Sequence, residues 1–340
     1  MLDDNRFIPK IVIMSFPEAL NDTCVLDNLT KKYGKDFVLP ARSEDKWLDP
    51  AKEGDIVFYN SPYDAVHPNF CVHYSIRKKF LPVMVAYGYP RSNYDNKVYA
   101  MDSYADSWKV LIENDFNLRQ YRKYSACSGN NALLTGYVKM DKYAEVKGEV
   151  KGGYTNVLGL SNFLRYSDKI VNVPKQYPEI DFIIRPHPAL FSTLLARGIW
   201  TNEKIKVWKK QMKSNTNGRG AENNDELQDF AAADAIVHDC GSYLVDWFYT
   251  GKPQCYMLKS HKDIKKKFTK FGQECLSHCF IAYSFEEVYE FIEKVVVSGN
   301  DTGAKSRIDF AEQKIMLNYP KASEKAIDSL VKEIMDGSTQ

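Results

Sequence analysis

Short apolar runs alternate with helix-like stretches along most of this chain, and that alternation limits the possible folds more than any other feature. Short continuous apolar runs are typical of strands that are buried on both faces. In the first part such runs cover residues 11–14, 55–59, 82–86, 109–112 and 132–134, and helical stretches cover 24–33 and 69–80. This order predicts a parallel sheet with helices on both of its faces.

The same pattern starts again after Met140, beyond a polar stretch at 142–153 that is rich in glycine and lysine. Strands are expected at 157–158, 182–184, 235–237, 255–258 and 280–282, and a helix at 161–173. Ser284 and Glu287 form a capping box that opens a further helix, and the last part of the chain is helical. We therefore predict an α/β fold with two doubly wound Rossmann-like domains, 1–145 and 146–340, the second including the terminal helices.

One segment of the second domain has the order of an anion-binding site. The apolar run that ends at Val237 stops at Asp239-Cys240-Gly241-Ser242, a helix-like segment follows, and Asp246 comes four residues after Ser242. The unpaired amides of a first helical turn, here those of Gly241 and Ser242, attract phosphate. Asp246 could accept hydrogen bonds from ribose hydroxyls, and Asp239 could orient the turn or cap the helix. The segment predicts a site for a nucleotide diphosphate.

A second segment of this domain presents a cation and an imidazole at the end of a strand. The run 181–184 stops abruptly at Arg185-Pro186-His187-Pro188. Prolines on both sides of His187 hold it on a stiff loop, which suits a group that must meet a phosphate in one geometry. The alternative for His187 is a loop histidine with a backbone partner. The alternative for Arg185 is an ion pair with a neighbouring acid.

These motifs together resemble the CDP-glycerol glycerophosphotransferase family, the teichoic acid primase and polymerase group, and its relatives in capsule and surface-polysaccharide clusters. The resemblance covers roughly residues 55–260. The matching segments are 60–64, 85–89, 131–141, 161–166, 185–188, 239–246 and 251–253. It implies a GT-B arrangement, in which the second domain binds the donor, the first binds the acceptor, and the cleft between them holds the reaction.

The resemblance also implies an activity. The enzyme would transfer a glycerol-phosphate or other polyol-phosphate unit from a CDP-linked donor to a hydroxyl of a surface-polysaccharide or lipid-linked acceptor. The sequence departs from the family at three places. Tyr87-Gly88 stands where a His-Gly pair is usual, Gly241-Ser242 replaces a double serine, and residues 147–158 are short and rich in glycine.

The expected transfer needs charge stabilisation and a base. His187, Arg185, Ser242 and the amides of the turn are the candidates for stabilising the diphosphate as CMP leaves. The base is expected from the first domain, where Asp64 and His67 follow a strand end. Tyr87 and Gly88 mark the acceptor side, although a tyrosine with a pKa near ~10 is a poor base at neutral pH.

Composition excludes several other classes of protein. The net charge is only +2, which gives no reason to expect a nucleic-acid partner. No apolar run is long enough to span a membrane, and the N-terminus lacks a signal-peptide pattern. The chain has seven cysteines at irregular spacings, which indicates reduced thiols. A structural metal site needs four ligands, and the cluster of Cys275, His278 and Cys279 supplies only three. We expect a cytoplasmic protein without metal or cofactor.

The basic run 262–267 is either a solvated face or a peripheral contact with anionic lipids at the inner face of the cell membrane. Two further alternatives for the function stay open. One is a GT-B glycosyltransferase that uses a CMP- or UDP-linked sugar. The other is a non-catalytic nucleotide-binding partner in a polysaccharide assembly, which the missing His-Gly pair favours.

Overall fold

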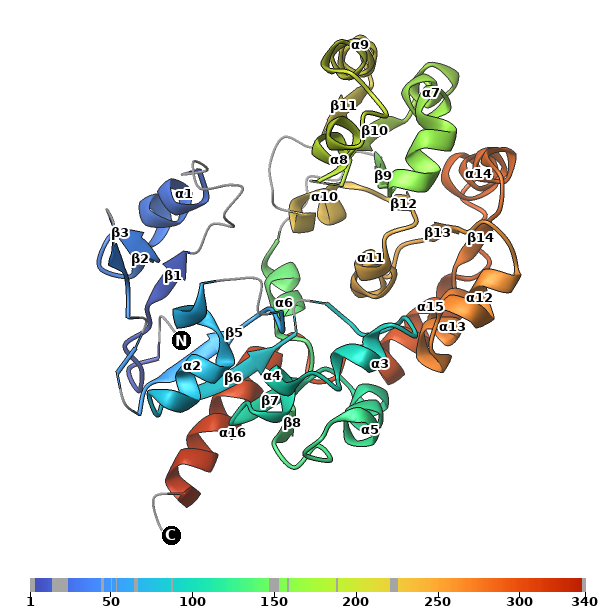
Figure 1. The fold of residues 1–340 in the computed structure, drawn as a ribbon. Helices are drawn as coiled ribbons and strands as arrows, with labels where there is room; N and C mark the ends of the chain where they lie inside the picture. Colours follow the sequence, from blue (N-terminus) through green and yellow to red (C-terminus); the bar gives the residue numbers. More distant parts are fainter. Residues whose placement is uncertain are drawn as a thin grey trace.

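The architecture is known from a computed structural model of the chain (Figure 1). It describes residues 4–13, 24–43, 46–49, 51–52, 54–63, 67–86, 88–146, 153–157, 159–187, 189–220 and 226–337. Two α/β halves follow one another along the sequence, each built on a parallel sheet. The predicted α/β fold with two parallel-sheet halves and a helical C-terminus is confirmed.

The second half is built on a six-stranded parallel sheet with the order β11-β10-β9-β12-β13-β14. Its strands are β9 (Gly153–Val157), β10 (Asp181–Ile184), β11 (Gly218–Gly220), β12 (Ala235–His238), β13 (Gln254–Met257) and β14 (Phe280–Ala282). The chain first builds outward from β9 to β11 and then returns to add β12 on the other side of β9. Ligands of open parallel sheets bind at such a reversal, beyond the carboxyl ends of the two central strands.

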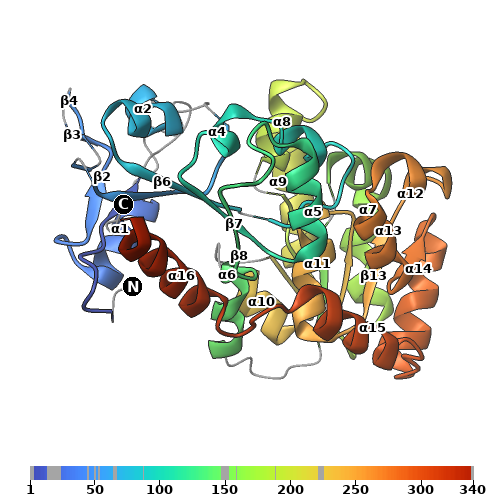
Figure 2. The same cartoon turned by 90° about the horizontal axis from the view of Figure 1, so that it is seen from below.

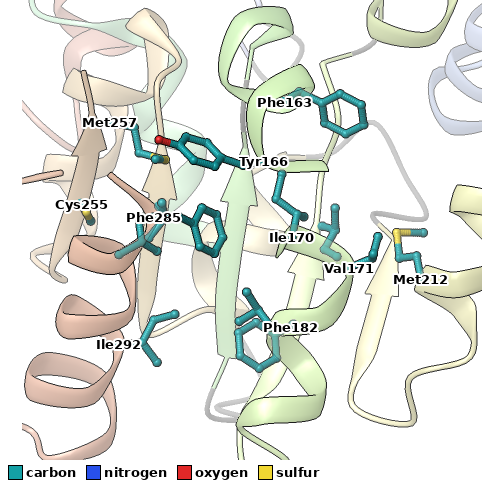
Figure 3. Close-up of a cluster of buried hydrophobic side chains, with 14 of the residues drawn as sticks. Phe163, Tyr166, Ile170, Val171, Phe182, Met212, Cys255, Met257, Phe285 and Ile292 are labelled. Carbon is teal, nitrogen blue, oxygen red and sulfur yellow. The ribbon is translucent and has the colours of Figure 1, made fainter. Parts of the chain in front are cut away.

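Two apolar clusters cover the opposite faces of this sheet. Val237 of β12 belongs to one cluster and Ile236 to the other, because neighbouring side chains of a strand point to opposite faces. Figure 3 shows part of the first cluster, which includes Phe163 and Ile170 of a long helix and Phe182 of the sheet. Every residue of β12 and β13 is buried, which explains why these strands read as continuous apolar runs.

The helices of the second half alternate with its strands, as expected from the sequence. They are α7 (Leu160–Gln176), α8 (Leu190–Ala196), α9 (Asn202–Lys213), α10 (Glu226–Ala232), α11 (Gly241–Asp246), α12 (Lys262–Lys267), α13 (Lys270–Ser277), α14 (Phe285–Phe291) and α15 (Ala304–Phe310). The capping box that opens α14 is confirmed, since Ser284 Oγ accepts a hydrogen bond from Glu287 N and Glu287 Oε2 accepts one from Ser284 N.

The first half is built on a four-stranded parallel sheet whose strands follow chain order. They are β5 (Ile56–Tyr59), β6 (Leu81–Val85), β7 (Lys109–Ile112) and β8 (Ala132–Leu134). The expected strand near residue 11 is β1 (Ile11–Ile13), which pairs in parallel with β2 (Val38–Pro40) in a separate small sheet. The hairpin strands β3 (Arg42–Ser43) and β4 (Lys46–Trp47) were not expected, because two-residue strands leave no pattern in a sequence.

Three of the helices described in the first half have only four residues each. The described helices of this half are α1 (Cys24–Tyr33), α2 (Val72–Arg77), α3 (Asp95–Val98), α4 (Asp102–Ala105), α5 (Asp115–Tyr124) and α6 (Val138–Asp141). The helix expected at 69–80 is divided into a 3-10 turn, Pro68–Phe70, and α2.

The C-terminal helix returns to the first half. After α15 the chain crosses over, and α16 (Ala322–Gly337) packs Ala326 and Leu330 into one cluster with Val83 and Leu111 of β6 and β7 (Figure 2). The carboxylate of Asp141 accepts hydrogen bonds from the first amides of α16. Residues counted with the second domain on sequence grounds are therefore part of the packing of the first half.

Candidate functional site

A cavity of about 60 Å³ lies where the two halves meet. Its walls come from the ends of β5 and β6 in the first half and from the start of α11 in the second. Tyr63, Gly88, Arg91 and Tyr104 line it from the first half, and Ser242 lines it from the second. The structure thus joins the two regions that the sequence assigned to acceptor and donor.

Gly88 and Ser242 face each other across this junction. A Cβ atom added to Gly88 would lie 3.7 Å from the hydroxyl oxygen of Ser242, an ordinary van der Waals distance. Ser242 belongs to the turn that the sequence singled out for phosphate, and Gly88 belongs to the segment singled out for the acceptor. The two predicted positions are therefore neighbours, although they are 154 positions apart in the sequence.

Arg91 is a residue of this site that the sequence did not reveal. Its guanidinium lies against Gly241, so closely that a Cβ atom added there would be 2.6 Å from Arg91 Cζ and nearer still to Nη2. A side chain at position 241 would clash with it. Glycine at position 241 leaves room for the guanidinium. The signal was slight: a basic residue that follows Pro90, just beyond a strand end.

Asp239 holds together the two central strands of the second half. Its carboxylate accepts hydrogen bonds from Gly159 N at 2.5 Å and from Asn162 Nδ2 at 2.9 Å, so it ties the end of β12 to the start of α7. Burial raises the pKa of Asp239, whereas these two hydrogen bonds lower it. The alternative that Asp239 caps α11 is wrong, because the N-cap of that helix is Cys240. Asp239 therefore stabilises the position of the turn that follows β12.

His187 is exposed at the same edge of the sheet. Its Nδ1 accepts a hydrogen bond from Ala189 N at 3.2 Å, the backbone partner that the sequence had left as an alternative. A neutral imidazole whose Nδ1 accepts must carry its proton on Nε2. The side chain is therefore set to donate a hydrogen bond from Nε2, which suits contact with a phosphate oxygen more than removal of a proton.

Arg185 is engaged in an ion pair. Its Nη2 and Nε lie 2.6 Å and 2.8 Å from Oδ2 of Asp229, and Asp229 is buried. Of the two roles expected for Arg185, the structure shows the pair with a neighbouring acid. A buried carboxylate needs this partner, because an isolated charge in the interior is costly.

Asp246 corrects a prediction. It was expected to meet a ribose, but its side chain is fully buried and its Oδ2 lies 2.7 Å from Lys139 Nζ. Lys139 also contacts Glu226 at 2.5 Å. Burial raises the pKa of Asp246 and the charge of Lys139 lowers it. The cause is local: α11 runs on into Trp247, which is buried in the core, so the end of this helix faces the protein interior.

Of the candidate bases, the structure describes His67 but not Asp64, nor Tyr87 of the acceptor side. The ring of His67 stacks on Trp47 with 4.0 Å between centroids, and its Nδ1 accepts a hydrogen bond from Asn69 N. These contacts give His67 a packing and capping role. Pro62 and Tyr63, which precede Asp64, line the cavity.

No three His, Cys, Asp or Glu side chains among the described residues are grouped as a metal site would require. Within the same ranges, no helix has the length and apolar character needed to cross a membrane.

Comparison with known proteins places the fold. No family model matches the sequence, and no curated protein matches it. Among solved structures, a UDP-GlcNAc 2-epimerase from Neisseria meningitidis, bound to UDP-GlcNAc, is similar with a TM-score of 0.61 and 10% identity over 97% of this chain and 93% of that one. Another UDP-N-acetylglucosamine 2-epimerase has a TM-score of 0.62, 10% identity and coverages of 97% and 89%.

The wall teichoic acid polymerase TagF is also similar, with a TM-score of 0.56 and 12% identity over 97% of this chain and 90% of that one. At such identities the likeness is one of fold, and a fold hosts many functions. Together with the strand order and the returning C-terminal helix, it shows that this chain has a GT-B-type fold of two Rossmann-like halves.

Proposed function

We propose that the protein is a transferase that moves a glycerol-phosphate or other polyol-phosphate unit from a CDP-linked donor to a hydroxyl of a surface-polysaccharide or lipid-linked acceptor. The observation that carries this proposal is that Gly88 and Ser242 lie next to each other in the wall of the cavity. A diphosphate on the turn at 241–242 would present its distal phosphate to the first half, where the acceptor would lie. A TagF structure soaked with CDPG is among the similar structures, which agrees with a donor of this class.

In this proposal the acceptor oxygen attacks the distal phosphorus, and the bond from that phosphorus to the bridging oxygen breaks, so that CMP leaves. The Ser242 hydroxyl and the amides of Gly241 and Ser242 donate hydrogen bonds to the phosphates. His187 donates from Nε2 to the diphosphate, and Asp239 keeps the turn in place. The acceptor proton passes to a base in the first half, for which Asp64 is the candidate.

Donor binding tests the proposal. Wild-type protein should bind CMP and CDP in a calorimetric titration, and Ser242→Asp should nearly abolish that binding by placing a negative charge beside the diphosphate. Asn300→Asp adds the same charge at an exposed position far along the sequence and should leave binding unchanged. Equal affinity of Ser242→Asp and wild type for CDP would show that the donor site lies elsewhere.

The choice of nucleotide separates the alternatives. CDP-glycerol or CDP-ribitol should release CMP when candidate acceptors are present. Preference for a UDP- or CMP-linked sugar would favour a glycosyltransferase in place of the proposed reaction. Nucleotide binding with no turnover of any donor would favour a non-catalytic partner.

We further propose a peripheral contact with anionic lipid headgroups through α12. Lys262, Lys265, Lys266 and Lys267 of this helix are exposed, and each basic residue near an anionic surface contributes about 1 kcal/mol. Vesicles of phosphatidylglycerol and phosphatidylcholine should retain the protein, and neutral vesicles should not. The double change Lys265→Gln and Lys266→Gln should weaken retention, whereas the same change at Lys209 and Lys210 of α9 should have little effect.

A further inference from the structure

Residues 91–93 belong to the first half by sequence but are bonded to the second. Thr269 donates to the carbonyl oxygen of Arg91 from its backbone N at 3.0 Å and from Oγ1 at 3.1 Å. Asn93 N donates to Lys267 O at 2.8 Å, and Ser92 forms an antiparallel bridge with Phe268. The backbone of Arg91 is therefore fixed to the segment between α12 and α13.

The side chain of Arg91 points to the turn at the end of β12. Its guanidinium covers Gly241 and lines the cavity beside Ser242. Its charge also reaches the groups around the turn. Burial raises the pKa of the Cys240 thiol, and the positive charge of Arg91 opposes that shift. Arg91 thus places a positive charge beside Gly241 and Ser242, where the sequence predicts a phosphate.

The guanidinium of Arg91 also donates a hydrogen bond from Nη1 to the carbonyl oxygen of Tyr89 at 3.4 Å. Two other basic residues near this position pair with acids. Arg185 pairs with Asp229, and Lys139 pairs with Asp246 and Glu226. Of the described residues that line the cavity, Arg91 is the one that carries a formal charge. A nucleoside diphosphate carries two to three negative charges and binds best to a planar guanidinium, which offers several donors in a fixed arrangement.

We infer that Arg91 is a phosphate-binding residue of the donor site, supplied by the first half and held in register with the turn at Gly241 by its bonds to Thr269. Its ligand is the diphosphate group of a nucleoside diphosphate. This inference rests on the proposed function for the identity of the nucleoside, but the contact of Arg91 with the diphosphate would be the same for any nucleoside diphosphate bound at the turn.

Titration of wild type and Arg91→Gln with CDP, cytidine and inorganic pyrophosphate tests the inference. Arg91→Gln should weaken binding of CDP and of pyrophosphate by roughly 10- to 100-fold, the effect of losing a hydrogen bond to a charged group. Binding of cytidine, which has no phosphate, should not change. The CDP affinity of the variant should also depend less on salt, and Arg91→Lys should restore only part of the affinity. Arg119→Gln, at an exposed position of α5, is the matched control and should bind as wild type does.

A double-mutant cycle tests the contact with Gly241. Gly241→Ala should displace the guanidinium and weaken CDP binding in the wild-type background. In the Arg91→Ala background no guanidinium occupies the space beside residue 241, so Gly241→Ala should weaken CDP binding much less. An equal loss of CDP affinity in the two backgrounds would show that the effect of Gly241 is independent of Arg91.

The three probes separate failure of this inference from failure of the proposed function. If Arg91→Gln binds CDP and pyrophosphate as tightly as wild type, Arg91 does not bind phosphate, although the proposed function stands. If wild type binds pyrophosphate through Arg91 but prefers another nucleoside diphosphate to CDP, the inference stands and the CDP-linked donor is wrong. If wild type binds neither pyrophosphate nor any nucleotide, both are wrong.

Discussion

Lys139 and Asp246 form an ion pair that joins the two halves of the protein, with 2.7 Å between Nζ and Oδ2. Lys139 comes from α6 in the first half, and Asp246 ends α11 in the second. Oδ1 of Asp246 is buried without a hydrogen-bond partner, so the buried negative charge of Asp246 is neutralised mainly by Lys139. A buried charge that loses its partner is strongly destabilising.

Asp246→Asn should therefore act on stability and not on nucleotide binding. We expect the free energy of unfolding, measured with urea, to fall by about 3 kcal/mol, because Lys139 loses a buried partner. The CDP affinity of the folded variant should match that of wild type. Asp309→Asn makes the same charge change at an exposed position of α15 and should leave both quantities unchanged. A variant of normal stability with weak CDP binding would restore the ribose role of Asp246.

His187→Ala should lower turnover by roughly 100-fold, the usual effect of removing one hydrogen-bond donor that stabilises developing charge, while the melting temperature changes little. The small effect on melting follows from the exposure of this side chain. His187→Asn is the informative control, because an asparagine oxygen can replace Nδ1 as acceptor from Ala189 N. If His187→Asn restores full turnover, the histidine only shapes its loop.

The pH–rate profiles of variants at Asp64 and His67 should show which of the two residues is the base. A base must be unprotonated to act, so the rate falls as pH drops below its pKa, and loss of the base removes this acid limb. We expect that result for Asp64→Asn, with donor affinity unchanged because the proposed donor site is the turn at 241–242 and the Arg91 guanidinium against it.

For His67→Gln we expect an unchanged profile and a stability loss of about 1 kcal/mol, since the ring stacks on Trp47. An acid limb that survives in Asp64→Asn but disappears in His67→Gln would reverse this assignment.

His238 should make stability depend on pH. It is fully buried, and burial lowers its pKa from 6.5 to about 4, opposed by hydrogen bonds with Gln254 and Cys240. Between these two pH values the unfolded chain binds a proton that the folded protein excludes. Its contribution to stability is therefore complete above pH 6.5 and is lost as pH falls toward 4.

The loss amounts to about 3 kcal/mol, from a pKa difference of roughly 2.5 at 1.36 kcal/mol for each unit. Urea unfolding at pH 7 and pH 4.5 measures it, and His238→Asn should show a smaller difference between the two. An equal pH dependence in wild type and His238→Asn would assign the effect to other groups.

Local patterns were enough to predict the layered fold. The runs that became β12 and β13 are apolar at nearly every position because both faces of the sheet are covered, and burial of that kind is visible in the sequence itself. The capping box of Ser284 and Glu287 spans four residues, so its hydrogen bonds are also predictable from the sequence. The position of the turn at Gly241 and Ser242 follows from the same local order of strand, small residues and helix.

The contacts between the halves could not be predicted in this way. Arg91 meets Gly241, and Lys139 meets Asp246, across more than one hundred residues, and neither pair leaves a periodic signal. Only the approach of α6 to α11 decided that a lysine, and not a ligand, would neutralise Asp246. The sequence by itself determined the buried strands, the turn at Gly241 and the cap of α14, because those depend on near neighbours. The tertiary structure decided which charges are compensated and which line the cavity, because burial depends on surfaces that come together only when the whole chain folds.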